Sequence, residues 1–264
     1  MLINFVILFI KDLLPIFILL CFVSTCVAPK NISLIKCNIT LVLSFIGIYL
    51  TFYFLSSMSE LFDGLGIEVI EAIELLIIYF CLLFSSSYLI TQDKLTTAQC
   101  NSIIMAIVLF TTINASQFIV FIDSYIVNSE SIRNVFIGLA IGFGICLSFS
   151  ALLYFSLLWL MRTRSHFIIY LMWALFLSGH VSQIINLLQQ VDIIESSGVL
   201  WDSSNMVKNS SEYGHLLNTL FGYEARPSSE FIMLYTASLL IFISYFIFVF
   251  LSKRQCSIDS TKEK

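Results

Sequence analysis

Three glutamates at intervals of three residues, Glu68, Glu71 and Glu74, lie within the otherwise apolar segment LFDGLGIEVIEAIELLIIYFCLLFSSSYLI, residues 61–90. Residues three apart on an α-helix are rotated by about 60° and separated by about 4.5 Å along the axis, so the carboxylates share one face. Near the centre of a bilayer each would cost about 3 kcal/mol, so a compensating partner is expected, and a cation is the simplest one. For Glu68 the alternative is that it snorkels to the headgroup region without a ligand.

The composition is that of a polytopic membrane protein. Of 264 residues, 59% are hydrophobic and 11% are charged, and the mean hydropathy is +0.96, which excludes an ordinary soluble domain. The seven cysteines form no CxxC or Cys/His cluster, so we interpret them as small buried hydrophobic residues. No feature indicates nucleic-acid binding. We expect no catalytic residues and no enzymatic activity.

We predict an all-α fold in a single domain, residues 1–264, with seven transmembrane helices. Seven apolar segments reach the roughly 20 residues that a spanning helix needs; they lie near 3–27, 35–55, 67–90, 103–126, 135–161, 167–188 and 231–251. The long polar connection 189–230 contains Trp201 and a Phe-Gly-Tyr turn, so we interpret it as a structured loop rather than a linker.

The distribution of Lys and Arg predicts the orientation of the chain. With the N-terminus outside, the inner side carries nine basic residues and the outer side three: Lys30, Lys36, Lys94, Arg162, Arg164, Lys253, Arg254, Lys262 and Lys264 against Arg133, Lys208 and Arg226. We therefore predict an integral protein of the cytoplasmic (inner or plasma) membrane, with an external loop at 189–230 and a cytoplasmic tail at 252–264.

Polar residues interrupt the middle of both the first and the fourth predicted helix: Lys11, Asp12 and Pro15 in one, Asn114, Ser116 and Gln117 in the other. Two units of three spans would insert with opposite orientations. The pattern is that of a 3+3 inverted repeat followed by one C-terminal helix, which would place a substrate site between the halves near the midplane.

The C-terminal third carries the residues Trp201-Asp202-Ser203-Ser204, Gly214, Leu216-Leu217, Leu220-Phe221-Gly222-Tyr223, Ala225, Pro227-Ser228 and Tyr235. Their order and spacing resemble those of the high-affinity iron permeases, the oxidase-coupled iron/lead transporter family. The segment LFDGLGIEVIEAIELL is similar to the start of that family's third helix, where a Glu-x-x-Glu pair follows a glycine-rich turn, here Glu68 and Glu71. The family's hallmark Arg-Glu-Gly-Leu-Glu, on the first and fourth helices, is intact in neither copy here.

The resemblance implies a permease that imports iron as its cargo, without a permanently bound cofactor, and that receives it from a periplasmic or surface ferroxidase or iron-binding protein. Ferric iron is a hard acid that prefers oxygen ligands. Glu68 and Glu71 are the first candidates for metal contact, with Glu74 on the same face. Asn114 and Gln117, three apart on the fourth predicted helix, would add neutral oxygens.

Two alternatives remain open. The ammonium of Lys11 would pair with Glu71 or Glu74 and take the place of the ion, which would leave a degenerate family paralogue acting as a non-transporting structural or regulatory membrane subunit. Alternatively, the cargo is another cation. His180 and His215 are interpreted as hydrogen-bonded structural residues rather than metal ligands.

Overall fold

The computed structural model describes residues 2–26, 34–61, 65–91, 96–127, 132–163 and 166–262. The predicted all-α class is confirmed: the described residues form helices joined by turns and loops, and no β-strand occurs among them. Val27, the predicted end of the first span, and residues 263–264 of the predicted tail lie outside the described residues. So do four of the basic residues that predict the orientation, Lys30, Lys94, Arg164 and Lys264.

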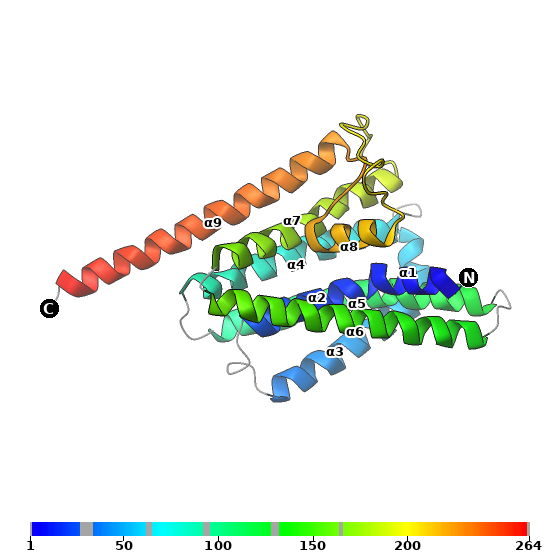
Figure 1. The fold of residues 1–264 in the computed structure, drawn as a ribbon, viewed down its shortest axis with the longest axis horizontal. Coiled ribbons are helices and arrows are strands. Elements are labelled where there is room, and N and C mark those ends of the chain that lie inside the picture. The colour runs from blue at the N-terminus through cyan, green and yellow to red at the C-terminus, as the bar shows by residue number, and fades with distance from the viewer. Residues whose placement is uncertain are drawn as a thin grey trace.

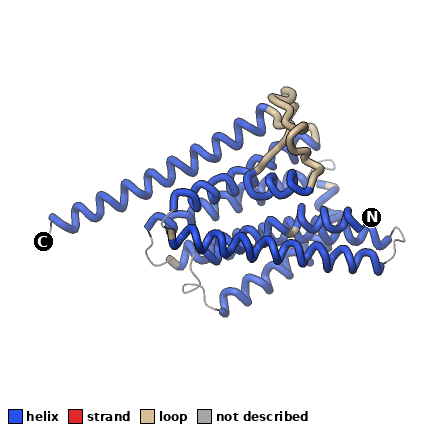
Figure 2. The backbone as a smooth tube through the Cα atoms, viewed as in Figure 1, coloured by secondary structure: helices blue, strands red, loops and turns tan. Residues whose placement is uncertain are grey.

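The helices follow one another as α1 (Leu2–Asp12), α2 (Leu14–Cys26), α3 (Leu34–Ser59), α4 (Gly66–Thr91), α5 (Thr97–Val127), α6 (Ile132–Arg162), α7 (His166–Gln190), α8 (Glu212–Phe221) and α9 (Ser229–Lys262) (Figure 1). Irregular backbone gathers between α7 and α9, around the short helix α8 (Figure 2). The predicted loop 189–230 therefore contains a helix of its own, and α9 continues through most of the predicted tail.

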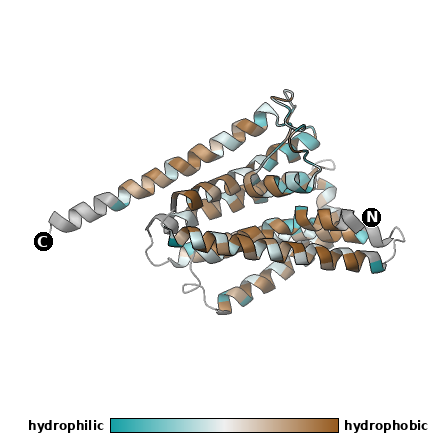
Figure 3. Ribbon diagram, in the orientation of Figure 1, coloured by the Kyte–Doolittle hydropathy of each residue, from teal (hydrophilic) through white to brown (hydrophobic). Residues whose placement is uncertain are grey.

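Long apolar runs favour helices because a backbone in lipid must satisfy its hydrogen bonds internally. Apolar residues dominate the long helices, whereas hydrophilic residues gather around α8 and at helix ends (Figure 3). Five helices, α3, α5, α6, α7 and α9, are long and apolar enough to cross a membrane, and the bent pair α1 and α2 makes a sixth. The chain is therefore an integral membrane protein. Helix α4, which carries the three glutamates, is not among these six, and the 3+3 repeat remains a prediction.

The first apolar segment is broken between α1 and α2, whose axes differ by 42°. Pro15 lacks a backbone N–H, so the carbonyl of Lys11 cannot receive the usual helical hydrogen bond from it. The next amide, that of Ile16, donates to the Leu13 carbonyl at 3.1 Å. Proline in the first turn of α2 thus restarts the helix in a new direction. The fourth predicted segment contains no proline, and α5 runs unbroken past Asn114, Ser116 and Gln117.

The core lies where α2, α4, α5 and α7 meet. Its largest fully buried side chains include Phe22, Phe110 and Phe176. By contrast, α3 and α9 expose much of their apolar surface, with Phe45 72% and Phe248 70% exposed, as expected of helices that face lipid.

The segment between α7 and α9 holds α8 against the helical bundle. Ser211 caps the start of α8 by accepting a hydrogen bond from the Gly214 amide, and Gly222 ends it in the left-handed conformation at φ 68°. Gly222 lies directly against Gly179 of α7, where neither residue leaves room for a side chain. The hydroxyl of Tyr235 in α9 donates to the Phe221 carbonyl at 2.9 Å. Residues of the Phe-Gly-Tyr turn therefore join α7, α8 and α9.

Candidate functional site

The three glutamates of α4 share one face of the helix but have different surroundings. Glu71 and Glu74 line cavities, whereas Glu68 lines neither of the two cavities described below. Glu71 lines both, so it lies between them. The sequence thus predicts that the three acids share a face. Which cavity each acid lines depends on the packing of the neighbouring helices.

A polar cavity of about 310 Å³, here called the central cavity, lies among the α1–α2 break, α4, α5, α7 and α8. Its polar lining is Lys11, Asp12, Glu71, Asn114, Gln117, His180, Gln183, Asn186, Gln190, His215, Asn218 and Thr219. The two interrupted segments of the sequence, together with Glu71, therefore meet at one place. Polar and ionisable groups gathered inside an apolar bundle are typical of a substrate or ion pathway.

Asp12 is the most deeply buried acid at the central cavity. It is 4% exposed and ends α1 at the break. Its carboxylate makes no hydrogen bond or ion pair with any described residue, so it is available to a ligand. The carboxylate of Glu71 has a protein partner, because the Gln117 side-chain amide donates to Glu71 Oε1 at 2.9 Å.

Two amide side chains of α5 supply neutral oxygens at the same cavity. Asn114 uses its Nδ2 to donate to the Phe110 carbonyl at 2.8 Å, and Gln117 uses its Nε2 for Glu71. Their oxygens, Asn114 Oδ1 and Gln117 Oε1, accept no hydrogen bond from the described residues. Carboxylate and amide oxygens together form a donor set that suits a hard cation.

Lys11 lies at the central cavity, but it is not locked to a carboxylate. Its charge acts on both Asp12 and Glu71. It is exposed, however, and forms no ion pair within the described part of the chain. Glu74 does not line the central cavity, so the predicted alternative pairing of Lys11 with Glu74 has no support in this arrangement.

Two histidines reach the central cavity, and the sequence did not single them out as site residues. The ring of His180 stands edge-on to those of Phe110 and Phe176, and its Nε2 is buried without a partner among the described residues. The prediction of a hydrogen-bonded His180 is thus wrong for that nitrogen, although the side chain of Gln183 forms a hydrogen bond with the His180 side chain. Burial, reinforced by the positive charge of Lys11, lowers the pKa of His215 in α8.

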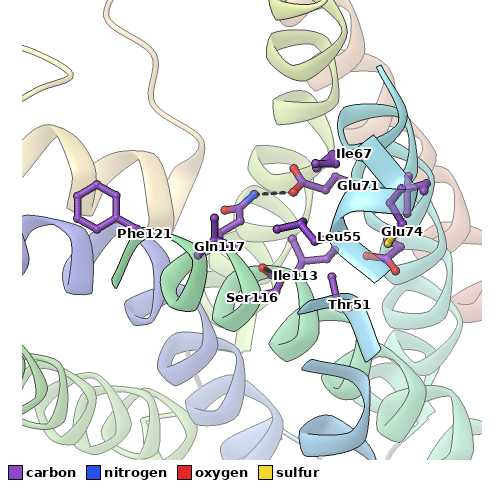
Figure 4. Close-up of a pocket in the computed structure, with 12 residues that line it drawn as sticks. Thr51, Leu55, Ile67, Glu71, Glu74, Ile113, Ser116, Gln117 and Phe121 are labelled. Atoms are coloured by element: carbon purple, nitrogen blue, oxygen red, sulfur yellow. Dashed lines mark hydrogen bonds between the residues drawn. The ribbon is translucent and has the colours of Figure 1, made fainter. Parts of the chain in front are cut away.

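A second cavity, of about 390 Å³ and here called the lateral cavity, lies between α3, α4 and α5. It is lined by Thr51, Leu55, Met58, Ile67, Ile70, Glu71, Glu74, Ile113, Ser116, Gln117, Val120 and Phe121. In Figure 4 the Gln117–Glu71 hydrogen bond crosses from α5 to α4, and Glu74 lies on the next turn. Both members of this bonded pair line the polar central cavity and the mainly apolar lateral one.

Four of the five predicted metal-contacting residues line these cavities. Glu71, Asn114 and Gln117 meet at the central cavity and Glu74 at the lateral one, whereas Glu68 lies apart. In the described ranges, no three His, Cys, Asp or Glu side chains gather closely enough to hold one metal ion. Any metal held by the described residues would therefore combine fewer acids with amide oxygens or water.

Comparison with protein-family models, with curated proteins and with solved structures finds no match to this chain.

Proposed function

We propose that the chain is a membrane permease that imports a cation through the central cavity, and that the cargo is iron. The observation that carries this proposal is a nearly fully buried carboxylate, Asp12, which has no hydrogen-bond or ion-pair partner among the described residues and lines the same cavity as Glu71. An unpaired carboxylate is costly inside an apolar bundle, so its presence there favours a cation pathway.

The donor set supports a transported ion rather than a permanently held one. Asp12 and Glu71 supply two negative charges, Asn114 and Gln117 supply neutral oxygens, and Lys11 opposes part of the negative charge. Conduction requires binding that is strong enough to admit the ion and weak enough to release it. A site with two acids and a nearby ammonium meets both requirements better than a closed cage of acids.

In the proposed topology the α1–α2 pair, α3, α4, α5, α6, α7 and α9 cross the cytoplasmic membrane, with the N-terminus outside and α8 on the outer side. The cargo assignment rests on the resemblance to the iron permeases. A ferroxidase or iron-binding protein on the outer surface is the partner that this resemblance implies.

Uptake of labelled iron into vesicles that contain the purified chain tests the proposal. Asp12→Asn and Glu71→Gln should each abolish uptake, because each removes one of the two carboxylates of the central cavity. Glu68→Gln is the matched control: it makes the same chemical change on α4 but lines neither cavity, so uptake should persist. Full uptake by the Asp12 and Glu71 variants would refute the site.

A second candidate function is favoured by Lys11, whose ammonium already lies at the central cavity. In that case the chain is a structural or regulatory membrane subunit that no longer transports. Absence of iron uptake by the unaltered chain, in vesicles where a positive-control permease is active, would favour this candidate or a different cargo cation.

A further inference from the structure

The lateral cavity has the size of a small-molecule site but a lining different from that of the central cavity. Its volume of about 390 Å³ falls in the range of ligand pockets. Leu55, Ile67 and Ile70 contribute apolar walls. Such walls cannot replace the hydration shell of a metal ion, so this cavity suits a ligand with an apolar body.

Glu74 is a polar group of the lateral cavity that has no hydrogen-bond partner in the part of the chain that the structure describes. The hydroxyls of Thr51 and Ser116 donate to carbonyls of their own helices, of Gly47 at 3.0 Å and of Ile113 at 2.9 Å. Glu74 makes no hydrogen bond or ion pair with any residue that the structure describes. A ligand that fills the cavity must therefore bring a hydrogen-bond donor, and preferably a positive charge, to Glu74.

The lateral cavity opens towards the apolar surface of the bundle. Leu55 and Met58 of α3, Ile67 of α4 and Val120 of α5 line the cavity and are only half-buried, so its wall reaches the surface of the bundle. Helices α3 and α4 also carry exposed apolar side chains, among them Phe54 and Ile73, which are 47% and 51% exposed. A ligand that partitions into the acyl chains of the bilayer would reach Glu74 from the side.

We propose that the lateral cavity binds an organic amine with an apolar body, its ammonium on Glu74 and its apolar part between α3 and α5. A neutral apolar molecule would leave the carboxylate unpaired, and a hydrated metal ion would leave the apolar walls unfilled. An amphiphilic ammonium pairs with the carboxylate and also fills the space between the apolar walls. This site is distinct from the proposed iron path, although Glu71 borders both cavities.

The test uses the full chain in phosphatidylcholine nanodiscs, with empty nanodiscs subtracted. The probes are phenethylamine and its neutral counterpart, phenethyl alcohol, and binding is measured by equilibrium dialysis and by the shift in melting temperature. The amine should bind saturably and at least tenfold more tightly than the alcohol. Glu74→Gln should weaken amine binding at least tenfold, and Glu68→Gln, on the same helix but outside the cavity, should leave it unchanged.

A second variant locates the site independently of charge. Leu55→Trp fills the lateral cavity and should abolish binding of the amine while Glu74 is kept. Equal binding of amine and alcohol, or unchanged amine binding by either Glu74→Gln or Leu55→Trp, would overturn the proposal. Asp12→Asn, expected to stop iron uptake, should bind the amine normally, so failure of the iron proposal and failure of this one are distinguishable.

Discussion

Substitution of Gly222 by alanine is expected to detach α8 from α7. Gly222 has φ 68°, and its added Cβ would stand 2.2 Å from the Cα of Gly179 and 3.2 Å from the ring of Tyr235. A left-handed conformation costs a non-glycine residue about 1–2 kcal/mol. Insertion of a methyl group into a closely packed contact adds about 1–3 kcal/mol. Because the first contact is backbone, which cannot rotate away, we expect a total loss of about 2–5 kcal/mol.

The measurement is the free energy of unfolding of the purified protein in mixed micelles, obtained from denaturant titration. The control is Gly144→Ala in α6, where an added Cβ meets nothing within 4 Å. Alanine is favoured over glycine inside a helix by about 1 kcal/mol, so this control should be neutral or slightly stabilising. Gly179→Ala creates the same clash from the other side, and the double variant should cost less than the sum of the two single losses.

If the free energy of unfolding of Gly222→Ala lies within about 0.5 kcal/mol of that of the unaltered chain, the close approach of α7 and α8 is refuted. Changes of that size are typical of surface substitutions away from packed contacts. The contact also matters for the site. His215 and Asn218 of α8 line the central cavity, so displacement of α8 removes part of its wall. Iron uptake should therefore fall in Gly222→Ala even where most of the protein remains folded.

Two further predictions concern charges. Lys11→Met removes a positive charge from the central cavity and should raise its affinity for iron about fivefold, on the order of 1 kcal/mol, in equilibrium binding; if Lys11 instead replaces the ion, the variant should lose stability without gaining affinity. Near α8, hydrogen bonds from Ser204 and the guanidinium of Arg226 at 2.8 Å lower the pKa of Asp202 from 3.8 to about 2. The stabilisation from this carboxylate is present above a pH of about 4 and lost as the pH falls through about 2. In Arg226→Gln the pKa of Asp202 should rise but stay below 3.8, because the bonds from Ser204 remain, and titration of the carboxyl carbon resonance measures this.

Helical structure could be predicted from the sequence because long apolar runs leave the backbone no other way to satisfy its hydrogen bonds in lipid. The sequence pattern alone does not show which of the two interrupted segments is broken. Both the first and the fourth segment carry polar residues near the middle, and only the first is broken. The physical difference is Pro15, which removes an amide, whereas Asn114 and Gln117 keep theirs and α5 remains continuous.

The composition of the central cavity depends on contacts between residues far apart in the chain, which periodicity does not reveal. Asp12, His180 and Asn218 meet there from α1, α7 and α8. The approach of α8 requires the Gly179–Gly222 contact, and two glycines separated by a long loop do not identify each other in a single sequence. The length of this loop, with its Trp201 and Phe-Gly-Tyr turn, predicts that the region is structured, but it does not predict that α8 lines the cavity.

The difference among the three glutamates follows from the neighbours of α4 rather than from the spacing of the acids. A step of three residues rotates the side chain by about 60°, which keeps all three on one face but changes the helix that each one meets. Glu71 accepts a hydrogen bond from Gln117 of α5, and both residues line both cavities. Glu74, one turn further along, meets the apolar space beside α3, and Glu68 meets neither cavity. Spacing alone would assign one cation to all three acids, whereas their surroundings assign Glu71 to a polar path and Glu74 to an apolar pocket.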